Sequence, residues 1–402
     1  MKLQDFKKKY AKSFKREGDI KLSAMWSEPS LISLEDEKEL PDGLHAKAKL
    51  IGVSPYGYRT FQGGVLLIEG MEKLQTVPEG TKADDSCFIV NCRNVRDLPS
   101  SINPFRQYEI ENCPALENLP AISFDAAYMN IIHCDSFKAL GSGTQFKGNL
   151  LIKDCPSFSQ ISHGVEIEGN FTVSSCDDLQ KIPEGLKAKS LHMAQCSNLT
   201  SLPIDLGKNV ADYVIIEYCP KLEEIPSAGD WTLLNLEGCT GLKRLPTDIK
   251  VRNTSAGRVD LTGCTSLKEI KSNISAPLIT FEGCTNLVEI SGKISTEELS
   301  AKDCKKLEML PDGLTVGSLL LNGCSSLVTL PGGMNIARKL DLRGTFVREL
   351  PRDLNVGWLM DLRSQDGIKI PQEVLDRHEG KIVFPPSYEV LPTLDASAPE
   401  PH

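Results

Sequence analysis

The sequence predicts an α/β solenoid of roughly 15 turns, in which short strands stack into one parallel sheet. Two observations predict it. Twelve of the thirteen cysteines recur at intervals of 20 to 25 residues, and apolar residues keep fixed positions around each of them. A repeat of this length can bury its apolar face only against its neighbours. The period therefore indicates stacked turns rather than separate globular domains.

A ladder of cysteines sets the frame of the repeat. Apolar residues stand five and three positions before each cysteine and three after it, and in eight turns a proline stands seven after it. The consensus is L-x-L-x-x-C-x-x-L-x-x-L-P. The ladder consists of Cys92, Cys113, Cys134, Cys155, Cys176, Cys196, Cys219, Cys239, Cys264, Cys284, Cys304 and Cys324.

Each column of the consensus has a physical reason. The apolar residues before the cysteine alternate with period two, which is typical of a strand with one buried face. Proline cannot pair in a central strand, so the chain must leave the sheet there. A small thiol fits the bend and is a weak donor to a backbone carbonyl that would otherwise lack a partner. Zinc sites use close pairs such as CxxC, and the sequence has none. We therefore expect free, buried thiols with no metal and no cofactor.

The ladder continues beyond the cysteines, because the same frame places Met71, Thr345 and Gln365 in the cysteine column. The repeats are therefore expected to span residues 31–371. Two intervals are long, and added loop length costs little, so tolerated loop growth is the simpler interpretation and a binding loop the alternative. The two long loops lie near residues 205–213 and 249–258.

The two ends differ from the repeats. Residues 1–30 are expected to form an amphipathic helical cap, because exposed solenoid ends need covers; attachment to a membrane surface is the alternative. Residues 372–402 are expected to form a closing cap followed by a Pro-rich disordered tail. The apolar side chains of the N-terminal helix would be Leu3, Phe6, Tyr10 and Phe14.

The consensus resembles the leucine-rich-repeat family, which carries Asn or Cys in the ladder column. The resemblance implies a horseshoe with its parallel sheet on the concave face. The LP-containing repeats also resemble the leucine-rich-repeat effectors that bacteria inject through type III-type secretion. Segments such as LNLEGCTGLKRLP and LDLRGTFVRELP are similar to the leucine-rich repeats of plant immune receptors. These resemblances imply a binding protein.

Several functional classes are disfavoured. A net charge of -9 argues against a nucleic-acid binder. The sequence has no run of eighteen apolar residues that would indicate a membrane anchor. The start of the given sequence lacks the apolar core of a signal peptide. The sequence contains no phosphate loop and no GxSxG or HExxH motif, so none of these motifs indicates an enzyme. One branch of the effectors carries a catalytic C-x-D, which here matches Cys176-Asp177-Asp178. Cys176 is a ladder cysteine, however, and a buried thiol is a poor nucleophile.

The strand residues between the buried columns should face a partner. Towards the middle of the chain these columns are acidic, and further on they become basic. The acidic residues are Glu217, Glu237, Asp260 and Glu282, and the basic residues are Lys302, Arg343 and Arg363. Glu217 and Glu237 are expected to stack on neighbouring strands, where like charges destabilise.

The sequence thus predicts a monomeric, non-catalytic scaffold with no catalytic residues, which binds a protein partner with a basic surface through its concave face. It would act as an effector, located in the cytoplasm or secreted without a signal peptide into a host cytosol. Two alternatives stay open: a ubiquitin-ligase-type effector or its substrate-recognition fragment, and an intracellular scaffold that is never exported.

Overall fold

The computed structural model describes residues 45–46, 49–54, 57–71, 73–77 and 79–393. It divides into two compact units, Met1–Asp205 (unit 1) and Leu206–His402 (unit 2). The helix predicted over residues 1–30 lies outside the described residues, as does the expected start of the repeats near residue 31. The two units are described separately below.

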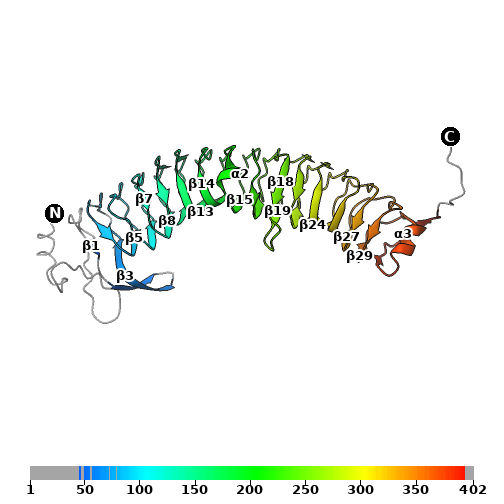
Figure 1. Ribbon diagram of the computed structural model, residues 1–402, viewed down its shortest axis with the longest axis horizontal. Helices are drawn as coiled ribbons and strands as arrows, with labels where there is room; N and C mark the ends of the chain where they lie inside the picture. Colours follow the sequence, from blue (N-terminus) through cyan, green and yellow to red (C-terminus); the bar gives the residue numbers. More distant parts are fainter. Residues whose placement is uncertain (1–44, 47–48, 55–56, 72, 78, 394–402) are drawn as a thin grey trace, which may run out of the picture. The chain divides into compact units, whose positions relative to one another are not determined.

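Unit 1 is a stack of parallel strands (Figure 1). Its main ladder runs β3-β5-β6-β8-β11-β13-β14, and β2 adds an antiparallel hairpin to β3. The strands are β1 (His45–Ala46), β2 (Lys49–Ser54), β3 (Gly57–Glu69), β4 (Lys82–Ala83), β5 (Ser86–Val90), β6 (Gln107–Glu111), β7 (Ser123–Phe124), β8 (Tyr128–Ile132), β9 (Ala139–Leu140), β10 (Gln145–Phe146), β11 (Asn149–Lys153), β12 (Gln160–Ile161), β13 (Glu166–Ser174) and β14 (Lys187–Ala194).

Unit 2 repeats this plan with shorter strands and a main ladder β15-β17-β19-β22-β24-β25-β27-β29-β31. Its strands are β15 (Tyr213–Glu217), β16 (Asp230–Trp231), β17 (Leu233–Asn235), β18 (Asp248–Val251), β19 (Arg258–Asp260), β20 (Glu269–Ile270), β21 (Asn273–Ser275), β22 (Leu278–Thr280), β23 (Glu289–Ile290), β24 (Ile294–Ser300), β25 (Thr315–Leu320), β26 (Asn335–Ile336), β27 (Lys339–Asp341), β28 (Asn355–Val356), β29 (Leu359–Asp361), β30 (Ile368–Pro371), β31 (Ile382–Val383) and β32 (Tyr388–Leu391). Its helices are α2 (Leu206–Asn209) and α3 (Gln372–Arg377).

The prediction of a parallel-sheet solenoid of about 15 turns is confirmed. Helix is scarce in the described part of the chain, where only the short α2 and α3 occur. Helix α2 lies in the first of the two long loops. The second contains β18 and then an exposed bend at residues 253–256. Most turns therefore return through bends and isolated bridges instead of helices.

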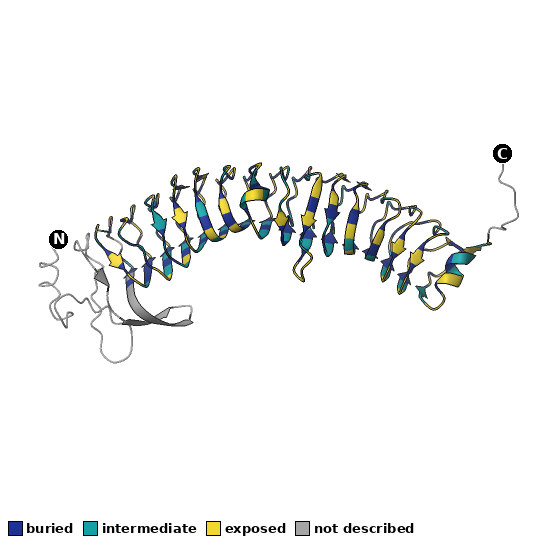
Figure 2. Ribbon diagram, in the orientation of Figure 1, coloured by how far each residue is buried: buried dark blue, intermediate teal, exposed yellow. Residues whose placement is uncertain are grey.

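The core contains the columns that the sequence predicts. All thirteen cysteines are buried, as are the apolar residues around them (Figure 2). Ladder thiols donate to a carbonyl of the preceding turn, at 3.5 to 4.0 Å in unit 1 and 3.0 to 3.2 Å in unit 2. In unit 2 this carbonyl is not otherwise orphaned, contrary to the prediction. Leu236 O accepts the Cys239 N–H at 3.1 Å as well as the Cys264 thiol at 3.2 Å. The thiol therefore donates to the second lone pair of this carbonyl oxygen.

The residue before each ladder position adopts a left-handed conformation, which the sequence reasoning did not predict. In unit 2 it is mostly glycine, as at Gly238 and Gly323, with φ of +70° and +84°. Glycine has no Cβ and takes this conformation at little cost. In unit 1 the residue before Met71 is also a glycine, Gly70, but the later turns hold side chains that tolerate this conformation less well. These residues are Asn91, Asn112, His133, Asp154, Ser175 and Gln195.

The C-terminal segment is more ordered than the sequence predicts. Strand β32, which lies in the part of residues 372–402 expected to be a disordered tail, pairs in parallel with β30. Phe384 and Tyr388 also stack, with ring centroids 5.0 Å apart. The sequence Tyr-Glu-Val-Leu alternates with period two, which its proline-rich surroundings obscure. Residues 394–402 lie outside the described part, and the boundaries of the cap stay a prediction.

Candidate protein-binding surface

In unit 2 the strand residues divide between a buried and an open face. In β15, Val214 and Ile216 are buried, whereas Ile215 and Glu217 are half-buried. Because side chains alternate along a strand, residues four and two positions before each ladder residue lie on the side away from the core. We call this side of the main ladder of unit 2 the open face. Every residue that the sequence predicts for partner binding lies on it.

Glu217 and Glu237, predicted as a stack of like charges, occupy equivalent positions on β15 and just after β17. Asn235 lies between them and is buried. Its Nδ2 donates to Glu217 Oε1 at 2.6 Å, and its Oδ1 accepts the backbone N–H of Glu237 at 2.9 Å. The repulsion expected between these like charges is therefore not the whole interaction. The local hydrogen bonds offset part of the repulsion between the two glutamates.

Tyr218 holds the second glutamate. Its hydroxyl donates to Glu237 Oε1 at 2.6 Å, and that carboxylate raises the pKa of the half-exposed Tyr218. The ring lies where a side chain at residue 238 would be, since a Cβ there would come within 2.4 Å of Tyr218 Cδ1. Glycine at residue 238 therefore allows the left-handed backbone and also leaves room for the Tyr218 ring. Sequence reasoning missed Tyr218 because the position before the ladder cysteine was not considered.

In the next two turns the open face carries one more acidic residue, Asp260, and then a glutamate, Glu282, whose charge is neutralised by a lysine. Asp260 is half-buried, and its Oδ1 accepts the backbone N–H of Thr262 at 3.0 Å. Glu282 Oε1 accepts from Ser300 Oγ at 2.6 Å and from Lys302 Nζ at 2.9 Å. Burial acts to raise the pKa of Glu282, but these two donors outweigh it and the pKa is lowered. The acidic patch on the open face is therefore Glu217, Glu237 and Asp260.

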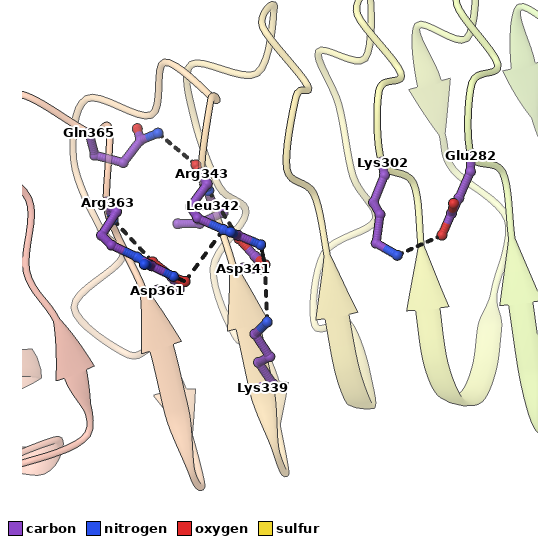
Figure 3. A network of polar contacts seen from close by, with 9 residues as sticks. All are labelled: Glu282, Lys302, Lys339, Asp341, Leu342, Arg343, Asp361, Arg363 and Gln365. Atoms are coloured by element: carbon purple, nitrogen blue, oxygen red, sulfur yellow. Dashed lines mark hydrogen bonds and ion pairs between the residues drawn. The ribbon is translucent and has the colours of Figure 1, made fainter.

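The predicted basic residues are held in ion pairs (Figure 3). Arg343 and Arg363 each form a two-bond fork with an aspartate two residues earlier, Asp341 or Asp361, at 2.7 to 3.0 Å. Both aspartates are buried. Burial alone would raise the pKa of Asp341, but the bonds from Arg343 and Lys339 hold it at about 2. Arg363 likewise lowers the pKa of Asp361.

The seven predicted residues thus fall into different environments. Glu217, Glu237 and Asp260 form one patch, held by hydrogen bonds from an amide, a hydroxyl and a backbone N–H. Glu282 and Lys302 pair with each other, and the two arginines cover buried aspartates. The spacing D-x-R at residues 341–343 and 361–363 was the available signal for these forks, since residues two apart on a strand share a face.

The geometry offers little support for cysteine chemistry. Cys176, the cysteine of the C-x-D match, is fully buried in unit 1, and burial raises the pKa of its thiol. The thiol donates to Ser174 O at 3.4 Å. A thiol that stays protonated is a poor nucleophile. The described residues also contain no group of three or more His, Cys, Asp or Glu arranged to hold a metal ion.

Among the helices that the structure describes, none has the length and apolar character needed to cross a membrane. The repeated strand, buried ladder residue and turn define the fold as a solenoid of parallel strands. No family model matches the chain, and no curated protein matches it. Among solved structures the chain is similar to the "Crystal structure of TLR13-ssRNA13 complex". The two are 11% identical over 78% of this chain and 67% of that chain, with a TM-score of 0.25. This similarity is too low to support an argument about a ligand.

Proposed function

We propose that this chain is a non-catalytic scaffold that binds a host protein through the open face of unit 2 and acts as an effector in the host cytosol. The acidic patch carries the proposal. Asn235, the Tyr218 hydroxyl and the Thr262 N–H are neutral donors, so these hydrogen bonds orient the carboxylates without cancelling their charge. A basic protein surface is the partner that such a patch attracts.

The nature of the partner follows from charge. An acidic patch on a chain with net charge -9 disfavours a nucleic acid, whose phosphates it would repel. Charged groups on an open face raise the rate of association more than the final affinity. We therefore expect the patch to steer a basic protein, with neighbouring half-buried residues of the open face supplying contact area.

The effector role rests on the resemblance of the repeats to bacterial leucine-rich-repeat effectors. A scaffold that is never exported has the same surface, and a test for translocation into host cells distinguishes the two. A ubiquitin-ligase-type effector is less well supported, because the C-x-D cysteine is buried with a raised pKa. A ubiquitin-discharge assay tests that alternative directly.

The acidic patch is tested by replacing Glu217 and Glu237 together with Gln. Glutamine keeps an acceptor oxygen for Asn235 and Tyr218, so the fold should persist. Binding is measured by surface plasmon resonance against an immobilised oligo-lysine peptide and against a host protein captured by the wild-type chain and then purified. We expect association to slow by at least about threefold and to depend less on salt, because salt screens exposed charges.

A control variant, Glu308→Gln with Glu379→Gln, removes two exposed negative charges of unit 2 away from the open face and should bind as the wild type does. Unchanged binding of the Glu217/Glu237 variant at both low and high salt would contradict the proposed site. The next surface to test would then be an apolar group in unit 1, of which Phe88 is buried and the other members are half-buried. That group is Phe88, Val90, Ile132 and Leu151.

A further inference from the structure

The open face of unit 2 carries two arginines in the same arrangement on successive turns (Figure 3). Asp341 and Asp361 are partners in register on β27 and β29. In each turn Nε of the arginine donates to Oδ1 of the aspartate, at 2.9 or 3.0 Å, and Nη2 donates to Oδ2 at 2.7 Å. Arg343 Nε also lies 3.4 Å from Asp361 Oδ2, which links the two forks.

The buried aspartates fix the orientation of both guanidinium groups. A guanidinium has five N–H donors, and each fork uses the edge formed by Nε and Nη2. The Nη1 group of each arginine then has no partner among the described residues. The Arg343 and Arg363 side chains are 41% and 58% exposed. The outer edges are therefore held in place and open to a ligand, with the entropy of ordering the side chains already lost in folding.

The local charge is positive on the outside. Lys339, Arg343 and Arg363 supply three cations against the two carboxylates of Asp341 and Asp361, which leaves one net positive charge. The two carboxylates are buried, and the guanidinium groups lie between them and the solvent. The low pKa of Asp341, about 2, keeps this arrangement intact at neutral pH.

We propose that Arg343 and Arg363 form a docking site for a carboxylate of an acidic segment in the protein partner. This inference rests on the proposed function and refines it. Arginine forks match carboxylates in geometry, and one net positive charge suits a singly charged group better than a phosphate dianion. The site would engage the partner beside the acidic patch, so the partner would present a basic and an acidic region in a fixed order.

The distances allow both regions to belong to one interface. Neighbouring strands lie about 4.8 Å apart, so the four steps from β19 to β27 separate Asp260 from Arg343 by about 20 Å. An ordinary interface covers about 800 Å² on each partner, on the order of 30 Å across. The Debye length in cells is about 8 Å, so the acidic patch would not repel a carboxylate docked at the arginines.

The test uses a fluorescein-labelled oligo-glutamate peptide, with binding measured by fluorescence anisotropy. Replacing Arg363 alone would remove the two-bond fork from buried Asp361, leaving it only Arg343 Nε at 3.4 Å, and would risk unfolding. The main variant is therefore Asp361→Asn with Arg363→Gln, which removes one cation and one anion together. The control is Glu223→Gln with Lys243→Gln, which removes an exposed pair 2.7 Å apart on another face of unit 2. Both variants keep the net charge of the wild type.

We expect the Asp361/Arg363 variant to bind the peptide at least tenfold more weakly and the control to bind as the wild type does. Arg363→Lys, which keeps the charge but not the fork, should also weaken binding several-fold. Wild-type affinity in the Asp361/Arg363 variant, with the fold confirmed by circular dichroism, would overturn the proposal. Tenfold tighter binding of an oligo-phosphoserine peptide of equal length, or competition by inorganic phosphate alone, would overturn the assignment to carboxylate.

This experiment is independent of the acidic patch. The Glu217/Glu237 variant should bind oligo-glutamate at least as well as the wild type, because it removes negative charge. Loss of oligo-glutamate binding in the Asp361/Arg363 variant would therefore support the docking site even if the proposed partner binding failed. Conversely, a failure here would leave the result for the acidic patch unaffected.

Discussion

His378 is a buried side chain that connects two turns of unit 2, and its replacement should open the C-terminal end of that unit. It follows α3 and is fully buried. Its Nε2 accepts the backbone N–H of Val356 at 2.8 Å, and its Nδ1 lies 2.7 Å from Val374 O. These contacts require a proton on Nδ1 and a lone pair on Nε2, which is the neutral ring.

Stability of this end should depend on pH. Burial lowers the pKa of His378 below its ordinary value of 6.5, and the positive charges of Arg377 and Lys381 act in the same direction. The hydrogen bond that His378 Nδ1–H donates to the Val374 carbonyl opposes them and acts to raise the pKa. Between the folded and unfolded pKa the unfolded chain binds more protons. The contribution is therefore fully present above pH 6.5 and is lost as the pH falls through 6.5 towards the lower folded pKa.

The size of the effect follows from the N–H of Val356. A buried donor left without a partner costs about 1 to 3 kcal/mol. Because about 1.4 kcal/mol is a factor of ten, His378→Ala should make opening at Val356 roughly 5- to 150-fold more frequent. His378→Gln can return an acceptor oxygen and has no titratable group. It should recover part of the protection and remove its dependence on pH.

The measurement is hydrogen exchange of the Val356 amide from pH 8 to pH 5, corrected for the intrinsic exchange rate. Protection in the wild type should fall below pH 6.5, and in His378→Ala it should be low throughout. The exposed His163 in unit 1, replaced by Ala, is the control. Wild-type protection that does not change with pH, or equal protection in His378→Ala, would refute the reasoning.

Three further substitutions test the repeat itself by urea denaturation. Cys264→Ala should lower the free energy of unfolding by roughly 1 to 2 kcal/mol through lost packing, and an unchanged value would mean that the thiol is not tightly packed. Gly323→Ala should cost more than Gly332→Ala. Gly323 has φ of +84° and a Cβ there would lie 2.3 Å from Asp303 Oδ1, whereas a Cβ at Gly332 meets nothing closer than 3.5 Å. Equal stability of the two glycine variants would contradict the requirement for glycine before the ladder.

The core of this fold could be predicted because each buried column repeats in every turn. A cysteine, Met71, Thr345 or Gln365 fills the same bend, and the apolar residues around it keep the same spacing. Gln365 shows why the frame holds despite a change of residue. Its Nε2 donates to Leu342 O at 2.6 Å, as the thiols donate in other turns. Periodicity thus identifies a position by its environment and not by one residue type.

The left-handed position before the ladder was missed for a physical reason. In unit 1 the residue type varies from turn to turn, so composition gives no signal. Asn, Asp and His tolerate this conformation through their short polar side chains, and neighbours interact across turns. Asn112 Nδ2 donates to Asn91 Oδ1 at 2.6 Å. In unit 2 the glycine before Cys239 and its equivalents was visible in the sequence, and it would have predicted the tight bend.

The contacts within the site could not be predicted from the columns alone. Alternation places Glu217 and Glu237 on one face, but it does not say whether the charges are opposed by a cation, an amide or nothing. Asn235 occupies the intervening column and is buried, so its two polar groups must find partners nearby. The adjacent glutamates are those partners. An asparagine between two acidic residues of a predicted open face is therefore a useful sign of an ordered acidic pair.

The two columns of the open face have different physical roles in unit 2. Asn235, Asp341 and Asp361, four residues before the ladder, are buried, whereas Glu237 and Arg343, two residues before it, are half-exposed. The inner residue of each pair hydrogen-bonds to the outer one or to its backbone. Asp260, also four residues before the ladder, is half-buried and belongs to the acidic patch. In the other turns, changes in the outer column should therefore alter which partner binds, while changes in the inner column should alter how firmly the outer side chains are held. A substitution such as Asn235→Ala should accordingly affect both stability and binding, whereas Glu237→Gln should affect binding alone.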